Sequence, residues 1–537
     1  MGGLTKWIAW LLLAAALVLQ AYIGIEQLQG DLVGTDPPAH FVSGVLFYDY
    51  VRGKAPASPF AFAQCFYVHY PKVALGQWPP VFYLFECAWF LLFGGTIASA
   101  RCLCAALAAG LAATVGWHCG LTWRRVGGIC SAAILLVVPP VQTLAWTVMS
   151  DLLLALFVYM ALWRFAEWFA RGAARDIWWC VLWSSLAILT KGTAFLLPAV
   201  FVAAPMFSGR TDKYRTPAFW ASVLLPLLIS APYFAYMEVL NLGYPINLPW
   251  QIHNLKLTFS SPSRLIPILG TITVVGCTVS RLRRLQISTR KGSLCLSMAL
   301  WVAAQAGFLL VLPHFTDEWQ RFLVPAMPPA ISLVVGILST LKRGDVLQIT
   351  TTAIIFTASL STPNPVVLGY TPVIDSIPHR AEGPVVWMQS DADGEGAVIA
   401  RRLESDSTRS TIIVRGAKML SDSTWSGYDY RMRYQDPAQV RTLLDEIQPD
   451  YIVFDRFARH RPDTDLLGAV LAGPDSGFSL ISTRAISGYG RRDEILVYRR
   501  QLPARPGPRS LPVTLGPERG HRTISCPAPP PGPNERK

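Results

Sequence analysis

Asp36 and His40 are the first residues of this chain whose types and spacing could carry out chemistry. They lie four residues apart, just after the first apolar run, and the apolar spacing over residues 37–51 predicts a helix. On a helix, this spacing places both side chains on one side. A carboxylate there could accept the proton of an attacking hydroxyl group. The alternative is that Asp36 only caps the helix, since Asp before a Pro-Pro pair is common at helix starts.

Two cations stand in apolar surroundings, where an ionisable side chain is costly and is therefore a functional candidate. Lys191 precedes Gly192 within a long apolar stretch, and a glycine allows close approach of a backbone. This arrangement suits the anion of a lipid phosphate, although the side chain could also simply extend to the membrane surface. Arg321 could hold two phosphate oxygens at once, or it could anchor an interfacial loop.

Four further residues complete the candidate set. Asp151 begins a predicted span, where a carboxylate is favoured by the helix dipole or could orient a substrate. Glu318 precedes Arg321 in the same polar segment. His69 and Lys72 end the first long loop, where they could line an entrance or belong to an interfacial segment.

Membrane-spanning helices are the elements that must position these residues. The 537 residues are 52% hydrophobic and 15% charged, whereas soluble domains carry about 25% charged residues. This composition excludes a disordered chain, a fibrous chain and an ordinary soluble protein. Apolar runs predict about 12 or 13 spans within residues 1–362. A Pro-Pro pair is expected to break 127–150 into a short hairpin or a pair of short helices that return to the outer side. The predicted spans are the first run to about residue 23 and the segments 79–97, 100–121, 127–148, 151–168, 177–190, 194–207, 218–238, 264–280, 294–313, 322–340 and 347–362.

The loop charges orient the predicted bundle. Four clusters of Lys and Arg fall on one side, which the positive-inside rule makes cytoplasmic. The clusters lie at 164–175, 210–215, 281–284 and 342–343. The candidate residues fall on the other face, together with a first outer loop over 25–78. The net charge of +13 therefore indicates membrane topology, and no nucleic-acid partner is predicted.

Residues 375–500 differ in kind, because they are polar and alternate between predicted strands and helices. Strands are expected near 385–388, 411–414, 451–454, 478–483 and 494–498, and helices near 397–403, 436–447 and 464–472. This pattern predicts a small α/β domain on the outer face, without a nucleotide-binding motif. The Pro- and Arg-rich tail 501–537 is predicted to be disordered. The ten cysteines indicate no disulfide framework. No two cysteines have the spacing of a zinc-binding pair, so no metal site is predicted.

Five local features resemble those of the GT-C glycosyltransferases, both in their order along the chain and in their place on the predicted outer face. The chain is most similar to the dolichyl-phosphate-mannose–protein mannosyltransferases and to bacterial relatives that act on lipid A or on the lipopolysaccharide core. The features are the segments 36–50, 79–101, 139–152, 189–198 and 321–325. The resemblance covers roughly residues 1–340. It implies an all-α polytopic GT-C-like bundle, to which a small C-terminal extracytoplasmic α/β domain is added.

The resemblance also implies an activity. It implies an inverting glycosyltransferase that moves a sugar from a polyprenyl-phosphate donor to a hydroxyl of a lipid, glycan or protein, at the outer face of a bacterial inner membrane. Carried over from the family, Asp36 is the general base, Lys191 and more weakly Arg321 contact the donor phosphate, and Asp151 matches an acid at the head of a middle span. The α/β domain is expected to choose the acceptor. No cofactor is firmly implied, and a divalent cation stays open.

Two positions depart from the family pattern. Pro37 stands where many members have Glu, and Trp78 stands where many have a basic residue. His40, Lys72 or Glu86 could compensate. The alternatives are a transporter or flippase of lipid-linked sugars, and an oligosaccharide polymerase or ligase. A proton-coupled transporter would more naturally show two matching halves with broken spans, and this sequence shows no such symmetry.

Overall fold

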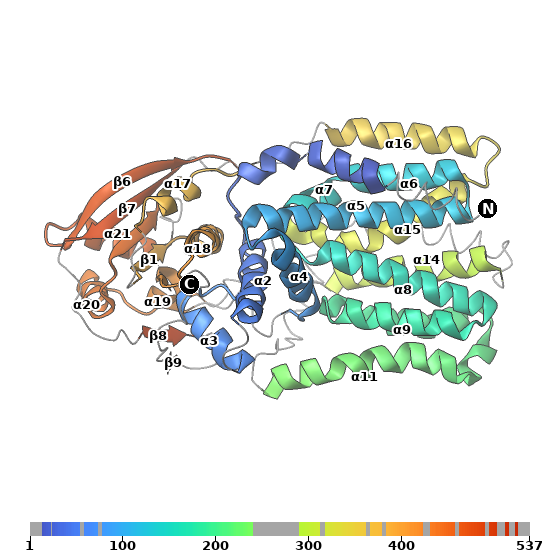
Figure 1. The fold of residues 1–537 in the computed structure, drawn as a ribbon, viewed down its shortest axis with the longest axis horizontal. Coiled ribbons are helices and arrows are strands. Elements are labelled where there is room, and N and C mark those ends of the chain that lie inside the picture. Colours follow the sequence, from blue (N-terminus) through green and yellow to red (C-terminus); the bar gives the residue numbers. More distant parts are fainter. Residues whose placement is uncertain are drawn as a thin grey trace. The chain divides into compact units, whose positions relative to one another are not determined.

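The computed structural model describes residues 13–22, 24–53, 58–73, 78–239, 289–311, 317–360, 366–378, 383–422, 430–456, 461–488, 493–501, 511–514 and 521–524. The chain divides into two compact units (Figure 1). The helical unit comprises Met1–Ile25, Leu75–Phe82 and Arg101–Asn364. The α/β unit comprises Glu26–Ala74, Tyr83–Ala100 and Pro365–Lys537. The first loop and the C-terminal domain, far apart in sequence, therefore belong to the same unit.

The helical unit is a bundle of apolar helices. Within the described residues, five helices are long and apolar enough to cross a membrane, or six when the bent pair α6–α7 is taken as one span. Its elements are α5 (Ile97–Thr122), α6 (Arg125–Val137), α7 (Pro139–Trp146), α8 (Asp151–Arg171), α9 (Ala174–Ile188), η2 (Gly192–Phe195), α10 (Leu196–Ser208), η3 (Thr211–Arg215), α11 (Pro217–Val239), α14 (Arg290–Val311), η4 (Asp317–Ala326), α15 (Met327–Leu338) and α16 (Gly344–Leu360). The protein is thus a polytopic helical membrane protein, as predicted.

The predicted break at the Pro-Pro pair is confirmed, because α6 and α7 meet there at an angle of 60°. Proline cannot donate a backbone hydrogen bond and its ring clashes with the preceding turn, so the helix ends at Val138. The predicted total of 12 or 13 spans includes shorter helices such as Val81–Phe93 and Gly192–Ser208. The predicted span 264–280 lies outside the described residues.

Close helix contacts in the bundle depend on small residues. A Cβ atom added at Gly128 on α6 would lie 2.5 Å from the carbonyl oxygen of Gly116 on α5. Only glycine allows this approach, which is typical of helix pairs in membranes. The helix α8 packs against α9 and α14 (Figure 1) and ends at Gly172, whose left-handed backbone (φ 75°) suits a residue without a side chain.

The α/β unit is built on a five-stranded sheet with the order β2-β1-β5-β7-β6. The strand β1 pairs in parallel with β2 and β5, while β7 runs antiparallel to both β5 and β6. Its strands are β1 (Val385–Gln389), β2 (Ile412–Arg415), β5 (Tyr451–Asp455), β6 (Phe478–Ile486) and β7 (Asp493–Arg500), with short pairs β3 (Ser421–Asp422) with β4 (Arg431–Met432) and β8 (Leu511–Thr514) with β9 (His521–Ile524). The predicted strands of the domain are confirmed.

Helices cover this sheet. Its helices are α17 (Tyr370–Asp375), α18 (Ala392–Ser405), α19 (Gly416–Leu420), α20 (Pro437–Ile447) and α21 (Pro462–Ala472). One apolar core joins α20 and α21 to residues such as Trp387 and Phe454, whose alternation along the strands places them on one face. The predicted start of α20 is confirmed, because the side chain of Asp436 accepts a hydrogen bond from the backbone N–H of Ala438.

The N-terminal part of the α/β unit adds η1 (Ile25–Gln29), α2 (Pro37–Arg52), α3 (Pro59–His69) and most of α4 (Val81–Phe93). Both carboxylate oxygens of Asp31 accept backbone hydrogen bonds, from Tyr370 at 2.8 Å and from Thr371 at 2.9 Å. The helix α2 packs against α18, and α3 packs against β2. These contacts explain why the first loop and the C-terminal domain form one compact unit.

Two findings in this unit differ from the sequence analysis. Cys65 on α3 is disulfide-bonded, although the cysteine pattern indicated no disulfide framework. The pair β8–β9 lies within the tail 501–537, for which disorder was predicted. Two short strands satisfy each other's backbone hydrogen bonds and need little apolar burial to pair, so apolar composition does not reveal them.

Candidate active site

Asp36 occupies the N-cap position of α2, but it does not cap the helix. Its backbone is helical (φ −91°, ψ −40°) and its side chain makes no capping hydrogen bond. A capping side chain would need an extended backbone to reach the free N–H groups of the first turn. The residue is only 6% exposed. The interpretation of Asp36 as a simple helix cap is therefore wrong, and its carboxylate is buried for another reason.

Lys72 is the cation that shares a charge cluster with Asp36. The side chain is buried, and Nζ donates a hydrogen bond of 2.9 Å to the carbonyl oxygen of Ala392 at the start of α18. The pKa of Lys72 is lowered to about 8, by burial first and by a nearby arginine next, while three carboxylates oppose this lowering. The charged groups that act on Lys72 are Arg415, Glu395, Asp393 and Asp36. The sequence-predicted residues Asp36 and Lys72 are thus brought together.

The two candidate histidines have different environments. His40 on α2 is buried and its Nδ1 lies 3.1 Å from the hydroxyl of Tyr83 on α4, in a hydrogen bond. Nδ1 of His69 lies 3.0 Å from the carbonyl oxygen of Thr411, and burial lowers its pKa. His40 therefore lies one helical turn from Asp36, whereas His69 ties α3 to the start of β2.

Glu86 on α4 faces the helix α2 next to these residues. The side chain is fully buried, and within the described residues its two carboxylate oxygens have no hydrogen-bond partner. A Cβ atom added at Gly44 on α2 would lie 2.6 Å from Oε2 of Glu86. The glycine therefore makes the room that this carboxyl group occupies.

Lys191 and Asp151 form a buried ion pair in the helical unit. Lys191 precedes η2, in the break between α9 and α10, and Nζ lies 2.7 Å from Oδ1 of Asp151 at the start of α8. Both side chains are buried, with exposures of 9% and 1%. The other oxygen of Asp151, Oδ2, has no hydrogen-bond partner among the described residues.

Arg321 is brought to the same place by an aromatic ring. Nζ of Lys191 lies 4.8 Å from the centre of the Phe322 ring, and Cζ of Arg321 lies 4.9 Å from the centre of the same ring. Contacts of this kind stabilise a cation by about 0.5–2 kcal/mol. The segment is held by α14, where Nε2 of Gln305 donates to the carbonyl oxygen of Phe322 at 2.8 Å. The two predicted phosphate contacts therefore gather at one ring.

This arrangement changes two interpretations. Lys191 does not extend to the membrane surface, because its ammonium group is buried against a carboxylate. Asp151 is the counter-ion of Lys191, so its carboxylate is engaged before any substrate binds. Glu318 belongs to η4 by its backbone, but its side chain lies outside the described part of the chain. Within the described residues, no three His, Cys, Asp or Glu side chains gather as metal ligands.

Sequence reasoning missed the partners that the C-terminal domain contributes. Glu395 forms a buried ion pair with Arg415 at 2.8 Å, and Asp393 accepts a hydrogen bond of 3.0 Å from the hydroxyl of Thr35. Acidic residues in the first turn of a helix are common because of the helix dipole, so these residues gave no signal of their own.

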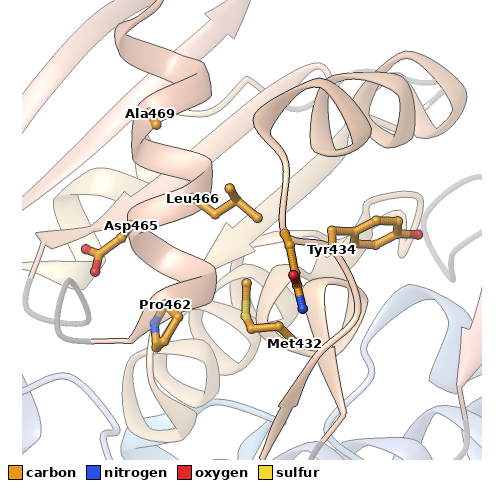
Figure 2. A pocket seen from close by; sticks show the side chains of 7 residues that line it. Met432, Tyr434, Pro462, Asp465, Leu466 and Ala469 are labelled. Carbon is orange, nitrogen blue, oxygen red and sulfur yellow. The ribbon is translucent and has the colours of Figure 1, made fainter.

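A separate pocket of about 540 Å³ lies in the α/β unit beside α21 (Figure 2). It is lined by Met432, Tyr434, Gln435, Pro462, Asp465, Leu466 and Ala469. None of the candidate residues from the sequence lines this pocket, and its walls are mostly apolar.

No protein-family model matches the chain, and no curated protein matches it. Solved structures with the GT-C fold match it over most of its length, so the predicted GT-C fold is confirmed. One is ArnT from Cupriavidus metallidurans bound to undecaprenyl phosphate, with a TM-score of 0.53 and 16% identity over 92% of this chain and 98% of that chain. Another is the oligosaccharyltransferase AglB from Archaeoglobus fulgidus in complex with an inhibitory peptide and a dolichol-phosphate. It has a TM-score of 0.50 and 11% identity over 87% of this chain and 72% of that chain.

Proposed function

We propose that this protein is an integral-membrane glycosyltransferase that takes a sugar from a polyprenyl-phosphate donor and transfers it to a hydroxyl group. The observation that carries the proposal is the likeness of fold, over 92% of the chain, to an enzyme structure that holds undecaprenyl phosphate. The described residues support it within each unit: the α/β unit holds the buried carboxylate of Asp36, and the helical unit holds Lys191 and Arg321 at the ring of Phe322.

Asp36 is the general base in this proposal. Its carboxylate takes the proton of the acceptor hydroxyl, and the oxygen attacks the anomeric carbon from the side opposite the phosphate. The new carbon–oxygen bond forms as the bond to the phosphate oxygen breaks, so the configuration at that carbon inverts. The lipid phosphate leaves with the electron pair of the broken bond, and Asp36 releases its proton to solvent.

Lys191 and Arg321 stabilise the departing phosphate. Cations fixed in advance near the developing negative charge stabilise it strongly in a site from which water is excluded. Asp151 serves this function indirectly, because it holds the ammonium group of Lys191 in place at 2.7 Å. The Phe322 ring keeps both cations close without neutralising them.

The active face is the outer face of a bacterial inner membrane, with the α/β domain on that side. The acceptor is a lipid, a glycan or a protein. The proposed mechanism uses only residues of this chain. Removal of metal ions with a chelator tests whether a divalent cation assists the transfer.

The variant Asp36→Asn tests the proposal. Purified protein in detergent is given a synthetic polyprenyl-phosphate sugar and an acceptor lipid, and the glycosylated product is quantified. Loss of the base should lower kcat by about 100- to 10,000-fold. Detergent micelles have no two compartments, so a flippase would give no product in this assay.

Asp345→Asn is the matched control, because Asp345 forms an exposed ion pair with Arg124 and has no place in the mechanism. It should transfer sugar at the normal rate. Normal transfer by the Asp36→Asn enzyme would show that Asp36 is not the base.

A further inference from the structure

The first turn of α18, in the C-terminal domain, packs directly onto the residues that flank Asp36. The hydroxyl of Thr35 donates a hydrogen bond of 3.0 Å to Oδ1 of Asp393. A Cβ atom added at Gly396 would lie 2.8 Å from Cγ of Pro38. The two sides of the turn that carries Asp36 are therefore both fixed by α18.

Lys72 completes this contact from the other end of the first loop. Its ammonium group is bound to the carbonyl oxygen of Ala392, the first residue of α18, at 2.9 Å. The lysine is only 1% exposed, so its charge is not screened by water. Three carboxylates surround it, of which two belong to α18 and the third is Asp36.

The side chain of Asp36 makes no capping hydrogen bond to α2. The first turn of α18 bonds to Thr35 and to Lys72 and packs against Pro38, so it lies beside the turn that carries Asp36. We propose that Lys72, seated on the first turn of α18, is a positioning residue for Asp36, so that the C-terminal domain takes part in the transfer step itself. This inference rests on the proposed function, in which Asp36 is the base.

A cation beside a carboxylate fixes the direction of that carboxylate, and small errors in the placement of a general base reduce rates strongly. Glu395 does not compete fully for Lys72, because Arg415 pairs with it at 2.8 Å.

Lys72→Met and Lys72→Arg test this role in the full-length enzyme. With methionine, kcat should fall by about 10- to 100-fold, while KM for the donor changes less than about twofold. Arginine keeps the charge and should restore most of kcat.

Lys418→Met is the matched control. Lys418 lies in the same unit, and its pKa is also lowered to about 8, by burial first and by Arg415 next. Asp36 is not among the charged groups that act on Lys418. Its removal should therefore leave kcat unchanged.

A raised KM for the donor with an unchanged kcat would overturn the inference, because Lys72 would then bind the donor phosphate. If Lys72→Met does not fold, Thr35→Val replaces it, since this variant removes only the hydrogen bond to Asp393. It should lower kcat several-fold at constant KM, and normal kcat in this variant would also overturn the inference. Normal transfer by Asp36→Asn would instead overturn the proposed function, so the two failures are distinguishable.

Discussion

The pair of Lys191 and Asp151 is the contact on which the phosphate side of the site depends. A salt bridge of 2.7 Å between two buried side chains is stable only while both charges are present. Removing one partner leaves an unpaired buried charge and destabilises a protein by about 3–5 kcal/mol. A single substitution at Lys191 therefore disturbs folding and phosphate binding together.

A double substitution separates the two effects. Lys191→Met should lower the unfolding temperature in detergent and abolish transfer. Adding Asp151→Leu removes the unpaired carboxylate, so the unfolding temperature should recover while transfer stays absent, because the phosphate still lacks its cation. Thermal unfolding and product formation are measured on the same preparations. Transfer by the double variant at a normal rate would show that Lys191 has only a structural role.

An isolated charge in an apolar stretch is visible without any structure, and Lys191 was singled out in this way. Asp36 was singled out by its place before a Pro-Pro pair and four residues from His40. Their partners were not, because Lys191 and Asp151 are 40 residues apart and Lys72 is 320 residues from Ala392. Such pairs arise from tertiary packing, and apolar spacing carries no information about them.

At the scale of elements, the connection between α3 and the end of α18 holds the first loop to the C-terminal domain. The hydroxyl of Tyr70, just after α3, donates a hydrogen bond of 2.8 Å to Oδ2 of Asp406. The same carboxylate accepts bonds from the backbone N–H of Thr411 and the hydroxyl of Thr408. Burial raises the pKa of Asp406, but these hydrogen bonds outweigh it and lower the pKa to about 2.

Asp406→Asn should therefore destabilise the α/β unit. An amide cannot accept all of these hydrogen bonds, and bonds to a charged group contribute about 1.5–3 kcal/mol each to stability. Because the pKa is lower in the folded state than in the unfolded state, this stabilisation is complete above about pH 4 and is lost as the pH falls toward 2. Hydrogen exchange at α3 and β2 measures the loss.

The exposed residue Asp465 gives the control, since Asp465→Asn should change stability by less than about 0.5 kcal/mol. An Asp406→Asn variant with normal protection at α3 and β2, and with an unchanged loss of stability below pH 4, would contradict the role assigned to this carboxylate.

Helices and strands were predictable where the sequence has a clear apolar pattern or a clear start signal. The strands β1 and β5 were found from short apolar runs, and α20 from its Asp436-Pro437 start. The assignment of α2 and α3 to the unit of the C-terminal domain was not predictable, because continuity along the chain suggests that a loop belongs with its neighbouring helices. The contacts of α2 with α18 show that this loop belongs with the C-terminal domain instead.

For the whole molecule, the GT-C fold and its membrane character followed from composition and from the order of weak motifs. The number of spans did not follow, because helices such as α9 and α10 are shorter than a full membrane crossing and meet at a break beside Lys191. A hydropathy pattern registers such a pair in the same way as two complete spans.

The orientation of the molecule is the remaining prediction at this scale. By the positive-inside rule, the basic clusters predict that the loop that contains η3 is cytoplasmic, and the α/β unit is then expected on the opposite side. Cys65 of the α/β unit is disulfide-bonded, and a disulfide bond is typical of an oxidising compartment. We therefore expect Thr483 on β6 to be reachable from outside the cell membrane and Thr211 on η3 to be reachable only from inside.

Matched threonine-to-cysteine substitutions test this expectation, because both positions are exposed. A membrane-impermeant maleimide should label Thr483→Cys in cells whose outer membrane has been permeabilised, whereas Thr211→Cys should be labelled only after the inner membrane is disrupted. The unsubstituted protein gives the background from its own thiols, of which Cys102 is exposed. Since the whole proposed mechanism places its acceptor on the side of the α/β unit, labelling in the reverse order would invert the topology. It would require a donor and an acceptor on the cytoplasmic face.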